Sequence, residues 1–384
     1  MIVVNTDNSH LLTHRYGWHK IILSLSNYIE SSIVLVDYMD KYFNLWYDFD
    51  KDIISENNEY KFSNKDAYYY INDVEKSDVF IHYDEFNLYH IIKWFPEYNQ
   101  FKTIPGEIIQ HFKKKSNIYS VLKPWIGFIH YPEFVPEMNY TSFEALPNIL
   151  KSNTFKESLP QCKCIITLSE HSKKYLLEQL EIYNYKVPVE VLFHPTDFTC
   201  LVFSLDKYNL NLEKKIIQVG FWMRKLNTIY KLNTNKYKKY WLPGGKYWKD
   251  TFNKTYKDDA IKYLSDTSVN ICMFLSNENY DELLSENIVL LDVFNSSANN
   301  TVLECIARNT PLITVKHPAI VEYLGEDYPL YFSNVEDLNN IINSNDFDNM
   351  INKAYNYLKK MDKTIFTLQY FCESFDKIVK KYYK

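Results

Sequence analysis

The sequence predicts an α/β protein with two doubly wound domains, each a parallel sheet covered by helices on both faces. Short apolar runs alternate with helical patterns along both halves of the chain, an order typical of parallel sheets. A linker near 195–213 separates the halves, and the pattern restarts after it. We therefore expect a first domain over 1–200, a second over 201–363 and a final amphipathic helix over 364–384.

The strands of the first half are predicted from short apolar runs, and a helix is expected wherever apolar residues recur at helical spacing. Ser169 precedes one such helical pattern and is a suitable N-cap. The expected strands are 1–5, 32–36, 79–82, 125–130, 164–167 and 189–193, and the expected helices are 18–28, 104–112 and the segment that follows Ser169.

The second half repeats the same order of strands and helices. The expected strands are 214–219, 268–275, 288–293 and 311–315, and the expected helices are 280–284 and 301–308. In open α/β sheets, ligands bind outside the carboxyl ends of the strands, so the loops that follow these strands are the places to search for a site.

Composition narrows the class of protein. Hydrophobic residues make up 46% of the chain and charged residues 24%, as in ordinary globular proteins. The net charge of −5 predicts no general nucleic-acid binding. No run approaches the roughly 18 apolar residues of a membrane span, and the N-terminus has no signal-peptide pattern. We expect a cytoplasmic protein with reduced cysteines, and abundant Tyr, Asn, Lys and Ile suggest an AT-rich microbial or viral source.

The segment SSANNTVLE, residues 296–304, joins a predicted strand to a predicted helix. The first-turn amides of Asn299, Asn300 and Thr301, with Ser297 beside them, suit a diphosphate, because a helix N-terminus attracts anions. Glu304 lies one turn further and can accept hydrogen bonds from sugar hydroxyls. Two alternatives remain open: an ordinary strand-to-helix connection, and a capping box formed by Thr301 and Glu304.

A second candidate loop follows the predicted strand 214–219. Gly220 opens it, and Arg224 and Lys225 follow as adjacent cations in a chain that has only three arginines. Two adjacent cations can neutralise a diphosphate and the charge that develops when it leaves. The alternative interpretation is a solvated basic turn.

The first half offers weaker candidates. Gly17 in THRYGWHK could let the backbone approach a ligand beside Arg15, and His130 ends a predicted strand, although a histidine there is more often structural. The chain lacks a GxGxxG fingerprint, which argues against a dinucleotide oxidoreductase. Two DxD matches, at Asp48 and Asp346, are too common a pattern to predict a metal site.

Several segments together resemble the GT-B glycosyltransferases, especially the large family four group that uses nucleotide sugars. The resemblance is best over about residues 160–335, and it lies in four segments: CIITLSEHSKKYLLEQL with VPVEVLFHPTD, KKIIQVGFWMRK, IVLLDVFNSSANNTVLECIARNTPLIT, and HPAIVEYLG. It implies two Rossmann-like domains that face each other across a cleft. The first would be the acceptor side and the second the nucleotide-sugar side, with the terminal helix crossing back to the first domain.

The resemblance also implies roles for individual residues. Glu304 would bind the donor ribose, the amides of Asn299 to Thr301 would bind its phosphates, and Arg224 and Lys225 would grip the diphosphate. Further contacts would come from Leu275, Ser276 and Asn277 near the base, and from Gly17 and His130 near the sugar and acceptor. Arg224, Lys225 and His130 are the candidate catalytic groups; Arg15, Gly220 and Ser297 join the donor-binding set.

The implied activity is transfer of a sugar, most simply a hexosyl group, from a UDP or GDP sugar to a carbohydrate or other hydroxyl acceptor. The nucleotide sugar is then a co-substrate, and neither a cofactor nor a metal is required. The family usually has an acidic residue eight positions before its ribose glutamate, where this chain has Ser296. Two alternatives follow: an inactive nucleotide-sugar-binding module and a sugar-nucleotide epimerase of the same fold.

Overall fold

The computed structural model describes residues 2–5, 18, 21, 24–25, 28, 34–36, 39–43, 80–82, 121, 124–132, 146–244, 248–273 and 275–383. These residues form two compact units, each with its own parallel sheet. The first unit contains the described residues up to Phe193 and those from Gln369 onward. The second unit contains the described residues of His194–Leu368. The domain boundaries expected at 200 and 363 stay predictions. The predicted helix at 104–112 lies outside the described residues.

The first unit contains a six-stranded parallel sheet with the order β3-β1-β2-β4-β5-β6. Its elements are β1 (Ile2–Asn5), β2 (Val34–Val36), α2 (Met39–Tyr42), β3 (Phe80–His82), β4 (Trp125–Ile129), α6 (Leu146–Lys151), α7 (Asn153–Ser158), η3 (Leu159–Gln161), β5 (Cys162–Thr167), α8 (Glu170–Ile182), β6 (Val189–Val191) and, after the second unit, α17 (Leu368–Tyr382).

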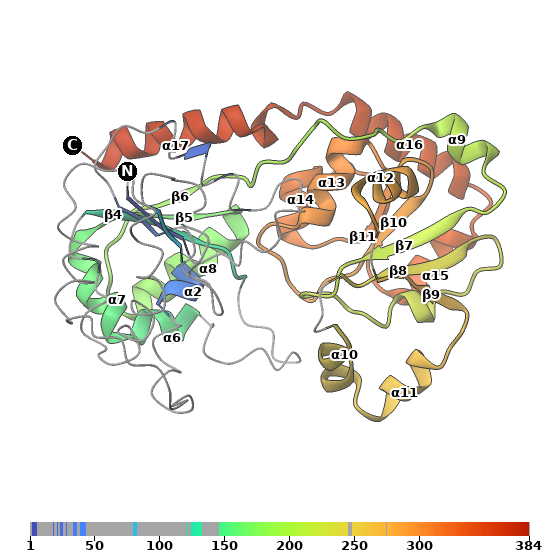
Figure 1. The fold of residues 1–384 in the computed structure, drawn as a ribbon, viewed down its shortest axis with the longest axis horizontal. Coiled ribbons are helices and arrows are strands. Elements are labelled where there is room, and N and C mark those ends of the chain that lie inside the picture. Colours follow the sequence, from blue (N-terminus) through green and yellow to red (C-terminus); the bar gives the residue numbers. More distant parts are fainter. Residues whose placement is uncertain are drawn as a thin grey trace, which may run out of the picture. The chain divides into compact units, whose positions relative to one another are not determined.

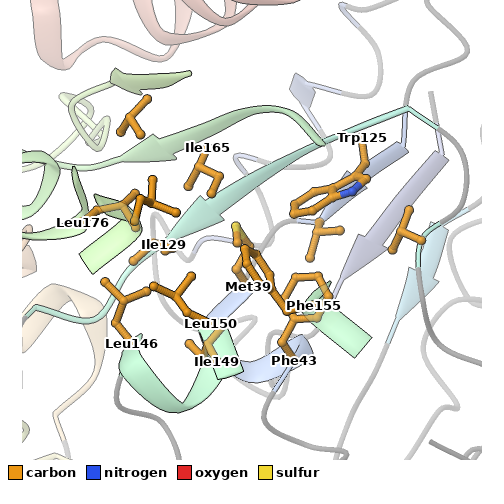
Figure 2. Close-up of a cluster of buried hydrophobic side chains, with 14 residues drawn as sticks. Met39, Phe43, Trp125, Ile129, Leu146, Ile149, Leu150, Phe155, Ile165 and Leu176 are labelled. Atoms are coloured by element: carbon orange, nitrogen blue, oxygen red, sulfur yellow. The ribbon is translucent and has the colours of Figure 1, made fainter. Parts of the chain in front are cut away.

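β4 separates two cores because successive side chains on a strand point to opposite faces. On one face Trp125 packs against Phe43 and Phe155, with ring centroids 5.6 and 6.5 Å away. Figure 2 shows this cluster, which includes Met39 of α2. Gly127 lies on the same face, and a Cβ there would come within 2.6 Å of the Met39 side chain, so glycine permits the close packing of α2 on β4.

The opposite face of β4 is covered by α17. Phe128 stacks on Phe371 and Phe375, at centroid distances of 6.0 and 5.7 Å, and α17 lies along this sheet in Figure 1. The end of the helix is tied to β6, because Lys381 Nζ and Tyr382 Oη both contact Glu190 Oε1, at 2.7 and 2.6 Å. The terminal helix therefore returns to the first unit, as the predicted fold class requires.

The second unit contains another six-stranded parallel sheet, with the order β12-β11-β10-β7-β8-β9. Its elements are α9 (Leu205–Leu210), β7 (Lys215–Val219), η4 (Ile229–Lys231), β8 (Lys238–Leu242), α10 (Trp248–Tyr256), α11 (Asp258–Leu264), β9 (Val269–Ile271), α12 (Asn277–Ser285), β10 (Ile288–Leu291), α13 (Asn300–Arg308), β11 (Leu312–Val315), α14 (Pro318–Leu324), β12 (Tyr331–Phe332), α15 (Val335–Asn343), α16 (Phe347–Lys360) and η5 (Thr364–Phe366).

The strand order of the second unit decides where a ligand can bind. Counted within the unit, the strands run 6-5-4-1-2-3, which is the Rossmann order read from the other edge. The order in which the strands are added to the sheet reverses between β7 and β10. Such a topological switch point is where doubly wound sheets bind nucleotides. β7 and β10 are adjacent in the sheet, with Ile217 beside Val289. The loops that follow them are therefore neighbours, although about 70 residues separate them in the sequence.

Candidate active site at the switch point of the second unit

Gly220 ends β7 in a conformation that only glycine adopts easily. Its φ is +80°, in the left-handed region where a Cβ is strained. Its backbone is hydrogen-bonded to two residues of β8: the amide donates to Leu242 O at 2.7 Å, and the carbonyl accepts from Trp241 Nε1 at 3.1 Å. A Cβ on Gly220 would lie 2.8 Å from the Arg224 guanidinium carbon. The glycine is thus needed both for the turn and for the position of Arg224.

The Arg224 side chain connects the loop after β7 to the start of α13. Its Nη1 donates to Trp222 O at 2.5 Å, and its Nη2 donates to Thr301 Oγ1 at 2.9 Å and to Asn299 Oδ1 at 3.5 Å. The two loops also pair through the backbone, because Phe294 N donates to Met223 O at 3.0 Å. The structure therefore brings together three residues that the sequence placed in separate candidate loops.

Gly220→Ala tests how closely the guanidinium packs on this turn. Gly244 provides a matched control, since its φ is +61° and no atom of the described residues lies within 4 Å of a Cβ placed there. Gly244→Ala should cost only the left-handed backbone strain, about 1–2 kcal/mol. Gly220→Ala should cost about 1 kcal/mol more, because the Arg224–Thr301 hydrogen bond is displaced.

Chemical denaturation of both glycine variants measures these costs. In an Arg224→Ala background the two substitutions should become equally costly, since the clash has been removed. Equal costs already in the wild-type background would show that Arg224 does not depend on Gly220.

Lys225 is paired with a buried carboxylate that the sequence did not single out. Its Nζ lies 3.5 Å from Asp292 Oδ1, and Thr228 Oγ1 donates to Asp292 Oδ2 at 2.9 Å. The Asp292 side chain is 4% exposed, whereas that of Lys225 is 42% exposed. Burial raises the pKa of Asp292, and the charge of Lys225 and the bond from Thr228 oppose that rise. A sequence signal existed, because Asp292 is an acidic residue at the carboxyl end of an apolar strand.

The N-terminus of α13 does not form a capping box. Asn299 is the N-cap, and its Oδ1 accepts from Thr301 N at 3.0 Å. Thr301 is the second helical residue, and its hydroxyl receives the Arg224 guanidinium instead. The capping-box interpretation of Thr301 and Glu304 is therefore wrong. The remaining first-turn amides have no partner within the helix and can serve an anion.

The polar segment before α13 is buried rather than solvated. Asn295, Ser296, Ser297 and Asn299 are all less than 9% exposed. Among the described residues, Ser297 Oγ has no hydrogen-bond partner. Buried polar groups are normally hydrogen-bonded, so a buried hydroxyl of this kind calls for an explanation. A ligand at the helix N-terminus would supply one.

Glu304 lies on the one open face of α13. Asn300 is exposed and Glu304 is half-buried, while the other seven residues of the helix are buried. Positions four apart lie one turn from each other on the same face. Glu304 is reached from α12, because Tyr280 Oη donates to Glu304 Oε2 at 2.5 Å. Tyr280 was not among the predicted site residues, and nothing distinguishes it in a sequence with 34 tyrosines.

The third arginine, Arg308, forms a buried ion pair and has a structural role. Its Nη2 donates to Asp281 Oδ1 at 2.7 Å, and both side chains are less than 10% exposed. Its Nη1 donates to Glu304 O at 3.3 Å. Arg308 thus joins α13 to α12 from inside the unit.

Leu275, Ser276 and Asn277 are exposed and lie just before or at the start of α12. Ser276 is the N-cap of the helix, and its hydroxyl accepts from Asn279 N at 3.2 Å. β9 is shorter than predicted and ends at Ile271. The segment 275–277 is thus one turn away from Tyr280 and connected through it to Glu304.

His130 belongs to the first unit and follows β4 directly. Its side chain is 10% exposed and contacts the Trp18 ring edge-on, with centroids 4.4 Å apart. The buried carboxylate of Asp40 lies 3.8 Å from His130 Nδ1 and accepts the backbone amides of His130 and Tyr131, at 2.7 and 3.1 Å. Asp40 was also not predicted. Arg15 and Gly17 lie outside the described residues.

The described residues contain neither a metal-binding cluster nor a membrane-spanning helix. No cluster of His, Cys, Asp or Glu with metal-ligand geometry occurs among the residues whose positions are given above. In the same part of the chain, no helix has the length and apolarity needed to cross a membrane. The six cysteines are free thiols.

Two Rossmann-like units, with the terminal helix returned to the first, define the GT-B fold. The comparisons with known proteins agree with this assignment. No protein-family model and no curated protein matches the sequence. Solved structures do match. Sucrose-phosphate synthase from Thermosynechococcus elongatus has a TM-score of 0.60 at 10% identity, over 100% of this chain and 98% of that chain.

Other solved structures also match over nearly the whole chain at low sequence identity. Anabaena HepE, solved with UDP-glucose, has a TM-score of 0.57 at 10% identity, over 99% of this chain and 100% of its own. The α,α-trehalose 6-phosphate synthase from Burkholderia multivorans has a TM-score of 0.56 at 9% identity, over 99% and 98%. At identities this low, structural similarity shows the fold and no more. The chain has the GT-B fold.

Proposed function

We propose that the chain is a glycosyltransferase that moves a hexosyl group from a nucleoside diphosphate sugar to a hydroxyl acceptor. One observation carries the proposal. At the switch point of the second unit, the Arg224 guanidinium contacts Thr301 at the N-terminus of α13, with Glu304 one turn further along the same helix. This arrangement combines a fixed cation, free helix amides and a carboxylate, which suit a diphosphate and its ribose.

The chemistry follows from where charge develops. When the glycosidic bond to the diphosphate breaks, negative charge accumulates on the leaving phosphate. Arg224, the α13 amides and the hydroxyl of Ser297 are the groups proposed to stabilise it, and Lys225 adds a partly exposed ammonium. With these groups in place the transfer needs no metal. Uridine is the favoured base, because HepE is described with UDP-glucose.

The first unit is proposed to bind the acceptor. His130 and Gly17 are the candidate residues there, whereas Arg15 belongs to the proposed donor-binding set. Asp40 holds the backbone at the end of β4 through two amide bonds, so it fixes where His130 lies.

A thermal-shift screen tests the proposal. Purified protein is heated with UDP, GDP, ADP, CMP, dTDP and their common sugar conjugates. A ligand at a hundred times its Kd should stabilise the protein by about 2.7 kcal/mol, a Tm increase of a few degrees. The diphosphate that binds then directs turnover assays, beginning with UDP-glucose. If no nucleotide shifts the Tm, the proposed donor site is wrong.

Turnover assays separate the alternative functions. Ser296 is 5% exposed and occupies the position where the family usually has an acidic residue, which favours a nucleotide-sugar-binding module without turnover. Binding with neither transfer nor donor hydrolysis across a broad acceptor panel would favour that module. Conversion of the donor into an isomer, with no acceptor present, would identify an epimerase.

Glu304→Gln should weaken UDP binding by about 10-fold or more, with little change in stability. The amide oxygen can still accept from Tyr280, but the amide nitrogen then faces the ribose as a donor, and a charge-assisted hydrogen bond of about 1.5–3 kcal/mol is lost. Isothermal titration calorimetry measures the Kd, and thermal unfolding confirms that the fold survives. An unchanged Kd would remove Glu304 from the nucleotide site.

A further inference from the structure

The carboxylate of Glu304 is held on one side before any ligand arrives. Tyr280 Oη donates to Oε2 at 2.5 Å. Among the residues that the structure describes, no hydrogen bond to the other oxygen, Oε1, is seen. A free glutamate on an open helix face would sample several rotamers, whereas this one has one carboxylate oxygen held by a hydrogen bond.

Tyr280 is itself held in place. Its ring lies beside the Arg308 guanidinium, whose central carbon is 5.6 Å from the ring centroid. Arg308 is in turn anchored by Asp281 and by the Glu304 carbonyl. Burial, and then the charge of Glu304, raise the pKa of Tyr280 well above its usual value. The phenol therefore keeps its proton and remains a donor to Glu304 at physiological pH.

This arrangement limits what Glu304 can do for a ribose. A carboxylate with two open oxygens can accept from two neighbouring hydroxyls at once. Here one lone pair of Oε2 already accepts a short hydrogen bond from a rigid donor, so Oε1 is the oxygen with more room to accept from a ligand.

We propose that Tyr280 is a positioning residue that orients Glu304 so that its open oxygen takes a single ribose hydroxyl of the donor nucleotide. The inference rests on the proposed function and makes it more specific. It predicts that the two ribose hydroxyls contribute unequally to binding, and that Tyr280 is the reason.

Calorimetric Kd values for UDP, 2′-deoxy-UDP and 3′-deoxy-UDP test the inference. Wild-type protein should bind one deoxy analogue about 10-fold or more weakly than UDP, and the other within about 3-fold of UDP. Tyr280→Phe should bind UDP about 10-fold more weakly, and the two analogues should then bind with similar Kd values. The loss of one charge-assisted hydrogen bond sets the expected size of these changes in Kd.

Tyr237→Phe is the matched control. Tyr237 is also a buried tyrosine of the second unit, and its hydroxyl bonds Tyr208 rather than Glu304. This variant should keep the wild-type ratio between the two analogues, even if it lowers the Tm.

Two results would overturn the inference while leaving the proposed function intact. One is UDP binding by wild-type protein with equal losses for both analogues. The other is a Tyr280→Phe variant that keeps the wild-type ratio between them. If wild-type protein binds neither UDP nor any other nucleoside diphosphate of the thermal-shift screen, the proposed function fails, and the inference fails with it. If the screen selects GDP, the guanosine series replaces the uridine series.

Discussion

Arg224→Ala should lower kcat/KM for sugar transfer by two or more orders of magnitude, about 3 kcal/mol of transition-state stabilisation. The guanidinium is anchored by Trp222 O and Thr301 Oγ1, so in the proposed donor site it is already fixed where leaving-group charge would develop. A preorganised cation of this kind acts without reorganisation during the reaction. Steady-state kinetics with the donor that the thermal-shift screen selects measures the effect.

Two further variants make this result interpretable. Arg224→Lys keeps the charge but loses the planar fork, so its kcat/KM should lie between those of wild type and Arg224→Ala. Lys236→Ala removes an exposed cation of the same unit and should leave kcat/KM unchanged. If Arg224→Ala retains wild-type turnover, Arg224 has no part in the reaction and is only a connection between two loops.

Asp281→Ala should destabilise the second unit by about 3–5 kcal/mol. Asp281 and Arg308 form an ion pair at 2.7 Å with side chains 9% and 4% exposed. Removal of one partner leaves the other charge buried without its counter-ion, which costs far more than the pair itself contributes. Chemical denaturation, monitored through the tryptophans of the unit, measures the change.

The exposed pair between Lys238 and Glu213 is the control. Its side chains are 49% and 65% exposed, so Glu213→Gln should change the free energy of unfolding by less than about 1 kcal/mol. The double variant Asp281→Leu with Arg308→Met should recover most of the loss, because neither charge is then buried. A cost for Asp281→Ala as small as that for Glu213→Gln would mean that Arg308 finds another counter-charge, for which Glu304 is the nearest candidate.

The class of fold and the two loops of the site were predictable from local sequence. Buried strands such as Ile288–Leu291 are short apolar runs, and their alternation with helices predicts parallel sheets. A glycine after a predicted strand, followed by an arginine in a chain with few arginines, indicated Gly220 and Arg224 as candidate site residues. The terminal helix was predicted from its periodicity, and Phe371 and Phe375 lie on its buried face.

Other elements gave too weak a local signal. β8 is missing from the predicted strands, because Lys238–Leu242 opens with two lysines and a tyrosine that are exposed or half-buried. The N-cap of α13 was also misplaced, since Asn299 and Thr301 are both acceptable caps by residue type. Only the backbone conformation at Asn299 decides between them.

By itself, the sequence predicted most of the strands, their order along the chain and the residue types at the strand ends. The tertiary structure decided which of those residues meet. Because β10 is adjacent to β7 rather than to β9, Arg224 reaches Thr301 and Lys225 reaches Asp292. Because α12 packs beside α13 through Arg308 and Asp281, Tyr280 reaches Glu304. Periodicity records which face of an element is buried, but strand order and helix packing arise from long-range contacts that no local pattern contains.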